Sequence, residues 1–178
     1  MKNFKWMAAT AATALTVATL SVITAAPAQA VGTAMTLTLT GGALEISAPA
    51  TANLGSVAAM AAGRVYSAQL GEVVVTDNRA ADAGAGWIAS AISTALTPTS
   101  GPAIAATYIA YSAGTVTTTG TVTTTDNDPS TIIGVSPVVT ATAITGSNTA
   151  TWNPTLSITI GGTFVAGAYT GTITHSVL

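Results

Sequence analysis

Apolar and polar residues alternate along much of the chain with the two-residue period of half-buried β-strands. Residues 35–40 read MTLTLT, with Met35, Leu37 and Leu39 on one face and threonines on the other. This pattern predicts a strand, and we expect Gly41-Gly42 to turn the chain after it. Leu44 and Ile46 then resume the alternation, which predicts a second strand.

The stretch from Val73 to Trp87 stands at the centre of this pattern. It follows two predicted strands, 64–70 and 72–76, which we expect to be one strand bent at Gly71. Its sequence VVVTDNRAADAGAGW predicts a strand, a tight charged turn and a second strand that delivers Trp87 into a core. Arg79 could pair with Asp77 or with Asp82 across this turn, and such an exposed pair is expected to contribute little to stability.

The rest of the chain continues the alternation. Further strands are predicted over residues 104–111, 132–135, 138–144, 156–160 and 169–178, with loops or turns over residues 49–55, 97–102, 126–129 and 146–148. The threonine-rich run 114–125 has too few apolar residues for a core strand, so we expect an exposed edge hairpin or an extended loop. The last strand, which begins at Tyr169, is predicted to pair with 156–160.

Short strands separated by turn signals about every 8 to 12 residues are typical of an antiparallel sandwich. No amphipathic helical pattern follows residue 30. The sequence therefore predicts an all-β fold, an antiparallel β-sandwich of immunoglobulin-like, Greek-key type.

The first 30 residues have the three parts of a secretory signal. Lys2 and Lys5 begin it, an apolar run follows, and Ala28-Gln29-Ala30 fits the small-x-small cleavage rule. Threonine and serine interrupt the run, whereas a retained membrane anchor needs about 20 strongly apolar residues. We predict a cleaved signal peptide over residues 1–30, a single domain over residues 31–178, and a secreted, extracellular product.

Charge is scarce in the predicted mature part. Residues 31–178 hold two arginines, no lysine and six acidic residues, a formal charge of −4. Such a chain lacks the basic surface that nucleic acids and anionic lipids require, so we predict no nucleic-acid partner and no membrane contact after signal cleavage. Little charge repulsion opposes self-association. The chain has no cysteine, which excludes disulfides and a lipid-modified cysteine.

The residues give no basis for catalysis. His175 is the one histidine, and no acidic residue lies near it in sequence to orient it as a base. Asp77, Asp82, Asp126 and Asp128 could form a carboxylate pair on paper, but all four lie in predicted turns, where aspartate is common for backbone reasons. We predict a non-enzymatic protein with no catalytic residues.

No cofactor or metal is predicted. A zinc site needs three or four histidine, cysteine or carboxylate ligands. Calcium is the one metal with candidate ligands, at 126–128 and at Asp77-Asn78 with Asp82, although neither set matches the EF-hand spacing. Trp87 and Trp152 each begin an apolar segment, which favours core positions over an exposed platform for sugar rings.

Two features together resemble the WxL-type cell-surface domains of Gram-positive bacteria. The first is V-x-V-x-D-x-R, here Val73 to Arg79 with Asp77, followed by a glycine-rich stretch and Gly86-Trp87. The second is a closing threonine-rich strand led by Tyr169. The chain departs from the family at Ala89, where the name-giving motif has leucine. The resemblance implies a divergent relative, a secreted β-sandwich held non-covalently on the cell wall, with Asp77, Arg79, Trp87 and Tyr169 as its motif residues.

Two functions follow from these observations. The first is a non-enzymatic surface protein that associates with the cell wall, with peptidoglycan or other surface proteins as partners. The alternative is a structural subunit that assembles into an extracellular fibre or matrix. The low charge, the abundant threonine and a bare strand edge at 115–125 favour this alternative, because unpaired edges template strand pairing.

Overall fold

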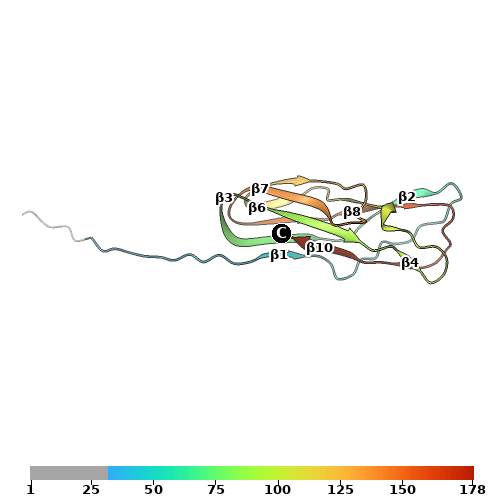
Figure 1. Cartoon of the computed structure of the whole chain (residues 1–178), viewed down its shortest axis with the longest axis horizontal. Helices are drawn as coiled ribbons and strands as arrows, with labels where there is room; N and C mark the ends of the chain where they lie inside the picture. Colours follow the sequence, from blue (N-terminus) through green and yellow to red (C-terminus); the bar gives the residue numbers. More distant parts are fainter. Residues whose placement is uncertain (1–31) are drawn as a thin grey trace, which may run out of the picture. The chain divides into compact units, whose positions relative to one another are not determined.

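The computed structural model describes residues 32–178, and Figure 1 shows their course. The predicted signal peptide over residues 1–30 lies outside the described residues. The chain divides into a unit that ends at Leu37 and a unit from Thr38 to Leu178. In the first unit, residues 32–37 form neither helix nor strand.

The unit from Thr38 onward is built almost wholly of antiparallel strands, with one short 3-10 turn at Ala106–Tyr108. The ten strands are β1 (Leu44–Ser47), β2 (Arg64–Gln69), β3 (Val73–Ser93), β4 (Thr97–Pro98), β5 (Ile109–Ser112), β6 (Thr117–Asp126), β7 (Ser136–Trp152), β8 (Thr155–Ile160), β9 (Tyr169–Thr170) and β10 (Ile173–Val177). The prediction of an all-β, antiparallel chain is confirmed. Between residues 32 and 178 there is no helix with the length and apolar character needed to cross a membrane.

The strands form open antiparallel sheets. One has the order β1-β3-β7-β6, with β10 also paired to β3, and the others are β2-β8-β5 and β4-β9. β2 and β3 run in succession along one side of β8 and β7, with Gln69 opposite Thr155 and Val73 opposite Trp152. β5 and β6 run in succession along the other side. The two larger sheets therefore continue into each other. Together they form three long ribbons of two successive strands each: β2 with β3, β8 with β7 in the centre, and β5 with β6.

The ribbons fold back on themselves beyond Asp77. In the ladder between β3 and β7, Asp77 lies opposite Asn148 and Trp87 lies opposite Ala141. A straight strand would separate Asp77 from Trp87 by roughly 33 Å, yet the Trp87 indole donates a hydrogen bond to Asn148 over 3.2 Å. The two halves of β3 and β7 must therefore face each other, and Figure 1 shows β3 curving at one end of this unit.

Irregular backbone accompanies the bend in all three ribbons. The register between β3 and β7 shifts repeatedly between Asp77 and Trp87. Positive φ angles occur in β3 at Ala80 (52°) and Gly84 (92°), in β7 at Ala143 (53°) and Gly146 (74°), and in β6 at Gly120 (78°). Bulges with such residues bend a strand and increase its twist. Alanine adopts this conformation only with strain, so other contacts must hold the bend in place.

The core fills the space between the facing halves. Trp87, Ala89 and Ala91 are buried along β3, and Leu156 and Ile158 are buried along β8. The other buried apolar residues are Val73, Val75, Ile104, Ala106, Ile109, Tyr111, Ala113, Ile132, Val138, Val139, Ala141, Ile144, Ala150 and Trp152. The prediction of core positions for both tryptophans, Trp87 and Trp152, is confirmed.

The predicted strand over residues 35–40 is wrong. Residues 32–43 contain no strand, and Met35, Leu37 and Leu39 are 92%, 95% and 84% exposed. We call residues 33–40 the N-terminal arm. Gly41-Gly42 does not form the expected turn: the Gly42 N–H pairs with the Asn78 carbonyl, extending the ladder of β1. The alternating pattern is present in the arm, but no described strand lies beside it.

The predicted breaks around β7 are also wrong. β7 begins at Ser136, includes Pro137, and continues without interruption through residues 146–148, which were expected to turn. Residues 132–135 form no strand, although the Ile132 side chain is buried and its backbone bonds to Ser93 and Ile109. The chain therefore turns back in space by bending β7 rather than by ending it.

Three further expectations need correction. The closing strand β10 pairs with residues 89–93 of β3 and not with β8, whose two edges are taken by β2 and β5. Residues 97–98 of the expected loop pair with β9. Part of the predicted strand 104–111 is the 3-10 turn. The run 114–125 is an edge strand, β6, which confirms its edge position but not the hairpin.

Candidate functional site

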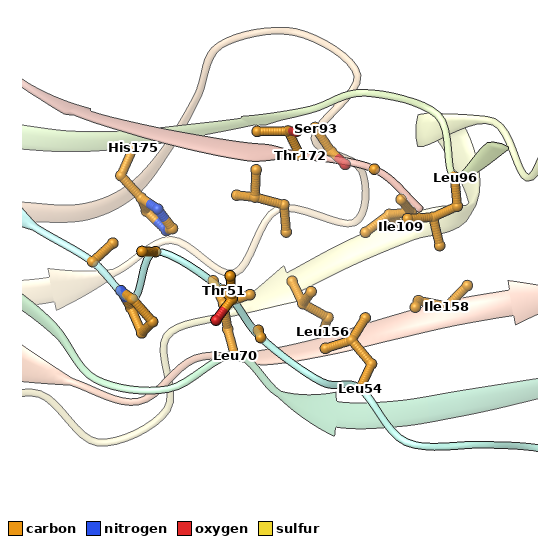
Figure 2. A pocket seen from close by; sticks show the side chains of 16 residues that line it. Thr51, Leu54, Leu70, Ser93, Leu96, Ile109, Leu156, Ile158, Thr172 and His175 are labelled. Atoms are coloured by element: carbon orange, nitrogen blue, oxygen red, sulfur yellow. The ribbon is translucent and has the colours of Figure 1, made fainter. Parts of the chain in front are cut away.

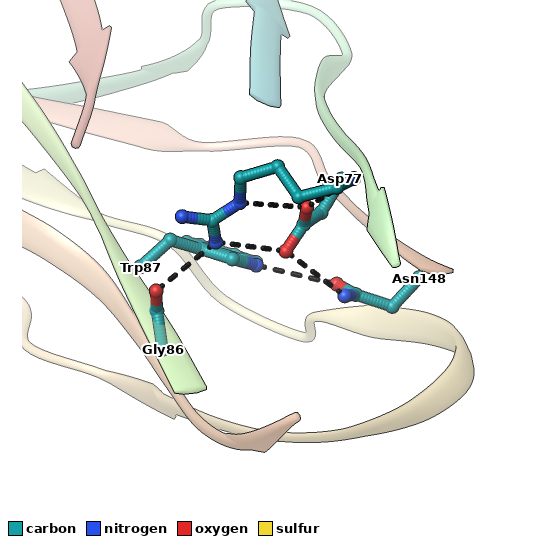
Figure 3. A network of polar contacts seen from close by, with 5 residues as sticks. Asp77, Gly86, Trp87 and Asn148 are labelled. Carbon is teal, nitrogen blue, oxygen red and sulfur yellow. Dashed lines mark hydrogen bonds and ion pairs between the residues drawn. The ribbon is translucent and has the colours of Figure 1, made fainter. Parts of the chain in front are cut away.

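Asp77, at the end of the first half of β3, is the centre of a buried polar network (Figure 3). The Arg79 guanidinium donates from Nε to Asp77 Oδ1 and from Nη2 to Asp77 Oδ2, both over 2.9 Å. The Arg79 backbone N–H adds a bond of 3.1 Å to Oδ1. Arg79 Nη2 also reaches the Gly86 carbonyl over 3.1 Å, so the arginine ties the two sides of the bend together.

Asn148 connects this carboxylate to Trp87. Its Nδ2 donates to Asp77 Oδ2 over 3.2 Å, and its Oδ1 accepts from Trp87 Nε1 over 3.2 Å. An indole N–H can only donate and a carboxylate can only accept, so one orientation of the amide satisfies both neighbours. The network thus joins residues from both halves of the folded ribbon.

The Asp77 side chain is 0% exposed and that of Arg79 is 35% exposed. The expectation of an exposed pair in a tight turn is therefore wrong, because both residues lie within the continuous strand β3 and the Asp77 carboxylate is fully desolvated. The hydrogen bond with the Arg79 side chain is the largest effect on Asp77 and lowers its pKa, while burial opposes this shift. Asp77 is held as a carboxylate whose oxygens already accept four hydrogen bonds.

The predicted motif residues are only partly brought together. Asp77, Arg79 and Trp87 meet in the network, whereas Tyr169 lies apart in β9 and donates its hydroxyl hydrogen to the Val165 carbonyl over 2.9 Å. Trp87 is buried and cannot touch a ligand at the surface. The sequence missed Asn148, because Gly146-Ser147-Asn148 has the composition of a turn and its partner Asp77 is 71 positions away.

A second polar contact sits beside a cavity of about 280 Å³ that His175 enters from β10 (Figure 2). The indole of Trp152 donates to the Tyr111 hydroxyl over 2.8 Å, and that hydroxyl lies 3.2 Å from His175 Nε2. Burial raises the pKa of Tyr111 and lowers the pKa of His175. A protonated phenol can therefore donate to a neutral imidazole.

This arrangement positions the imidazole but does not equip it as a base. The side-chain partner of His175 is a tyrosine hydroxyl and not a carboxylate, whereas a catalytic triad uses an acid to orient its histidine. The cavity is otherwise lined by aliphatic, threonine and serine side chains, among them Leu54, Leu156 and Thr172. Such a lining can pack against other apolar side chains or bind an apolar small molecule.

Two of the carboxylates considered for calcium, Asp77 and Asp128, are committed to other contacts. Asp77 is occupied by Arg79 and Asn148. Asp128 accepts a hydrogen bond of 2.9 Å from the Ala113 backbone. Over residues 32–178, no three histidine, cysteine, aspartate or glutamate side chains gather where they could share a metal ion.

A larger apolar groove of about 420 Å³ lies at the β2 end of the unit. Its walls come from Tyr66 of β2, Ile158 and Ile160 of β8, and the two coil segments 53–59 and 164–168. No charged side chain lines it. We call this the apolar groove; Tyr169 belongs to its rim, and the alternation of the sequence gave no signal for it because both coil segments lie outside the strands.

We expect Arg79→Met to lower the free energy of unfolding at pH 7 by about 2–4 kcal/mol, because the variant leaves the Asp77 carboxylate buried without its guanidinium. Arg64→Met is the matched control: Arg64 is exposed and contacts only the Met60 sulfur, so a change within about 0.5 kcal/mol is expected. Urea denaturation measures both. Equal losses in the two variants would contradict a stabilising role for the pair.

We expect the stability of the protein to fall as the pH drops below 6.5, the ordinary pKa of histidine. Burial lowers the pKa of His175 in the folded state, so the unfolded chain binds the proton more tightly and protonation favours unfolding. The chain has one histidine; His175→Gln should therefore flatten the dependence between about pH 7 and about pH 5. Identical slopes in thermal melts of both proteins would overturn this assignment.

Comparisons with protein-family models, with curated proteins and with solved structures found no match to this chain.

Proposed function

We propose that the chain is a secreted, non-enzymatic structural protein that self-associates outside the cell through open strand edges. We further propose that its fold is a β-sandwich of the predicted immunoglobulin-like type, with the facing halves of the bent ribbons as its two layers. The contact between Trp87 and Asn148 and the apolar core between the halves support two layers.

The observation that carries this proposal is the open edge of β6. This strand ends the order β1-β3-β7-β6, and β7 is its one strand partner among the described residues. Seven of its ten residues are threonine, and it contains neither lysine nor proline. Natural proteins use such residues to prevent edges from pairing with other chains. An edge of this length without them is suited to pairing with a second copy.

Scarce charge supports the same function. The chain from residue 31 onward has eight charged residues, and Asp77 and Arg79 neutralise each other within the fold. Copies that approach each other therefore experience little repulsion. The predicted signal peptide places the product outside the cell, where such an assembly would form.

We expect the purified protein to form larger species as its concentration rises. Sedimentation velocity measures this growth, and negative-stain microscopy shows the form of the product. Because few charges take part, the distribution should change little between about 0.05 M and about 1 M salt. Monomers at every concentration would contradict the proposal.

The cell-wall association that the WxL resemblance implies is a second candidate. It is supported by the meeting of Asp77, Arg79 and Trp87 in one network, since residues that carry the resemblance also act together in space. Their burial assigns them a structural role, so any wall contact must come from exposed residues elsewhere. Peptidoglycan or other surface proteins would be the partners.

We expect a fraction of the protein to co-sediment with purified peptidoglycan if the wall is its partner. Insoluble cellulose, a polysaccharide particle without peptide stems, is the control. Recovery of all protein in the supernatant, or equal binding to both particles, would count against specific wall association.

A further inference from the structure

The N-terminal arm has the pattern of a half-buried strand but lies bare. Met35, Leu37 and Leu39 point to one face by their spacing, and the threonines between them take the other. All three apolar side chains are more than four-fifths exposed. Three large apolar side chains on one exposed segment are unfavourable in water. A partner that covers this apolar face would therefore stabilise the segment.

The apolar groove offers a surface of matching character. It is lined by apolar side chains such as Ile160 and Phe164 and by no charged one. Its volume of about 420 Å³ falls within the range of sites that enclose a ligand. β2 forms one wall, and its strand partner among the described residues is β8 alone, so its second edge is open to an added strand.

The arm cannot reach the groove of its own chain. It joins the folded unit where the Gly42 N–H pairs with the Asn78 carbonyl. Tyr66 in the groove wall lies 12 residues back along β3 and β2 from that point, a distance of roughly 40 Å along the ribbon. The eight residues of the arm extend over roughly 26 Å. A second copy carries an identical groove without this restriction.

The ends of the unit suit a head-to-tail arrangement. β1, where the arm attaches, pairs near the bend of β3, while β2 and β4 lie at the other end in Figure 1. A contact between unlike ends leaves one free arm and one free groove after each addition, and such contacts build open filaments. Neither residues 32–43 nor the groove lining contains a charged side chain, so docking desolvates no charge.

We propose that the N-terminal arm of one copy docks as an added strand in the apolar groove of a second copy, with Met35, Leu37 and Leu39 facing into it. The inference rests on the proposed self-association and adds to it a contact between copies that is separate from the open edge of β6. The threonine face of the arm stays in water.

Engineered cysteines test the contact directly, because the chain has none of its own. The double variant Leu37→Cys/Val165→Cys places one thiol on the arm and one on the exposed rim of the groove. Mild oxidation should give a ladder of covalent oligomers on a non-reducing gel. Leu37→Cys/Thr119→Cys, with the second thiol on the edge of β6, is the matched control; pairing of β6 edges could link it into dimers, but it should give no ladder. A ladder from the control alone would place the arm on β6 and overturn the groove as its site.

Substitutions on one face of the arm or on the other, made in the full chain, supply the second test. Leu37→Asn/Leu39→Asn should raise the concentration needed for half-assembly by at least about tenfold, because two buried leucines are lost from the contact. Thr36→Asn/Thr38→Asn alters the opposite face and should shift the half-assembly concentration by less than about twofold. All four residues lie outside the strands, so these variants should leave the fold intact.

The outcomes separate this inference from the proposed function. Assembly that is indifferent to both arm variants would leave self-association standing and overturn the role of the arm. A wild-type protein that stays monomeric would overturn both. If the groove instead holds an apolar small molecule, native mass spectrometry will show monomers of increased mass and no covalent ladder, which also overturns the inference.

Discussion

The fold depends on one desolvated carboxylate. Asp77 is buried as an anion, and a buried charge is tolerated only with partners that replace water. Arg79 comes from the same strand, while Asn148 comes from β7 and binds Trp87 beyond the bend. The two partners of Asp77 also bind Gly86 and Trp87 on the other side of the bend, so the network that satisfies this group also holds the strands folded over. The bulged backbone between Asp77 and Trp87 bends β3 so that these contacts can form.

The network also selects the strand register. A slip of one residue between β3 and β7 would exchange the faces of the strand, turning Asp77 to solvent and separating it from Asn148. Apolar side chains alone would resist such a slip less strongly here, because alanine and threonine are frequent along both strands and many registers bury similar area. The network opposes the strain of Ala80 and Ala143, whose positive φ angles cost about 1–3 kcal/mol each.

The sequence predicted the β content and the core positions of Trp87 and Trp152, because the alternation and the apolar segments that these tryptophans begin depend only on local residues. It could not predict which strands pair with one another. The arm satisfies the same alternation, yet no strand of its own chain covers it, and β10 joined β3 because β8 was already paired on both edges. At the candidate site, Asp77, Arg79 and Trp87 were found through their motif, while Asn148 was missed because its meaning lies in contacts with residues 71 and 61 positions away.

Charge placement connects the interior of the protein with its surface. The chain uses one arginine and one aspartate to fix its bend, and it leaves β6, the arm and the groove lining without lysine or arginine. Lysine at strand edges helps to keep sheet proteins apart, so the absence of lysine and arginine from these three places leaves backbone and apolar groups open to other chains. In a crowded cell interior such surfaces would favour aggregation. Under the proposed secretion, copies would meet outside the cell instead, where the same surfaces can join them.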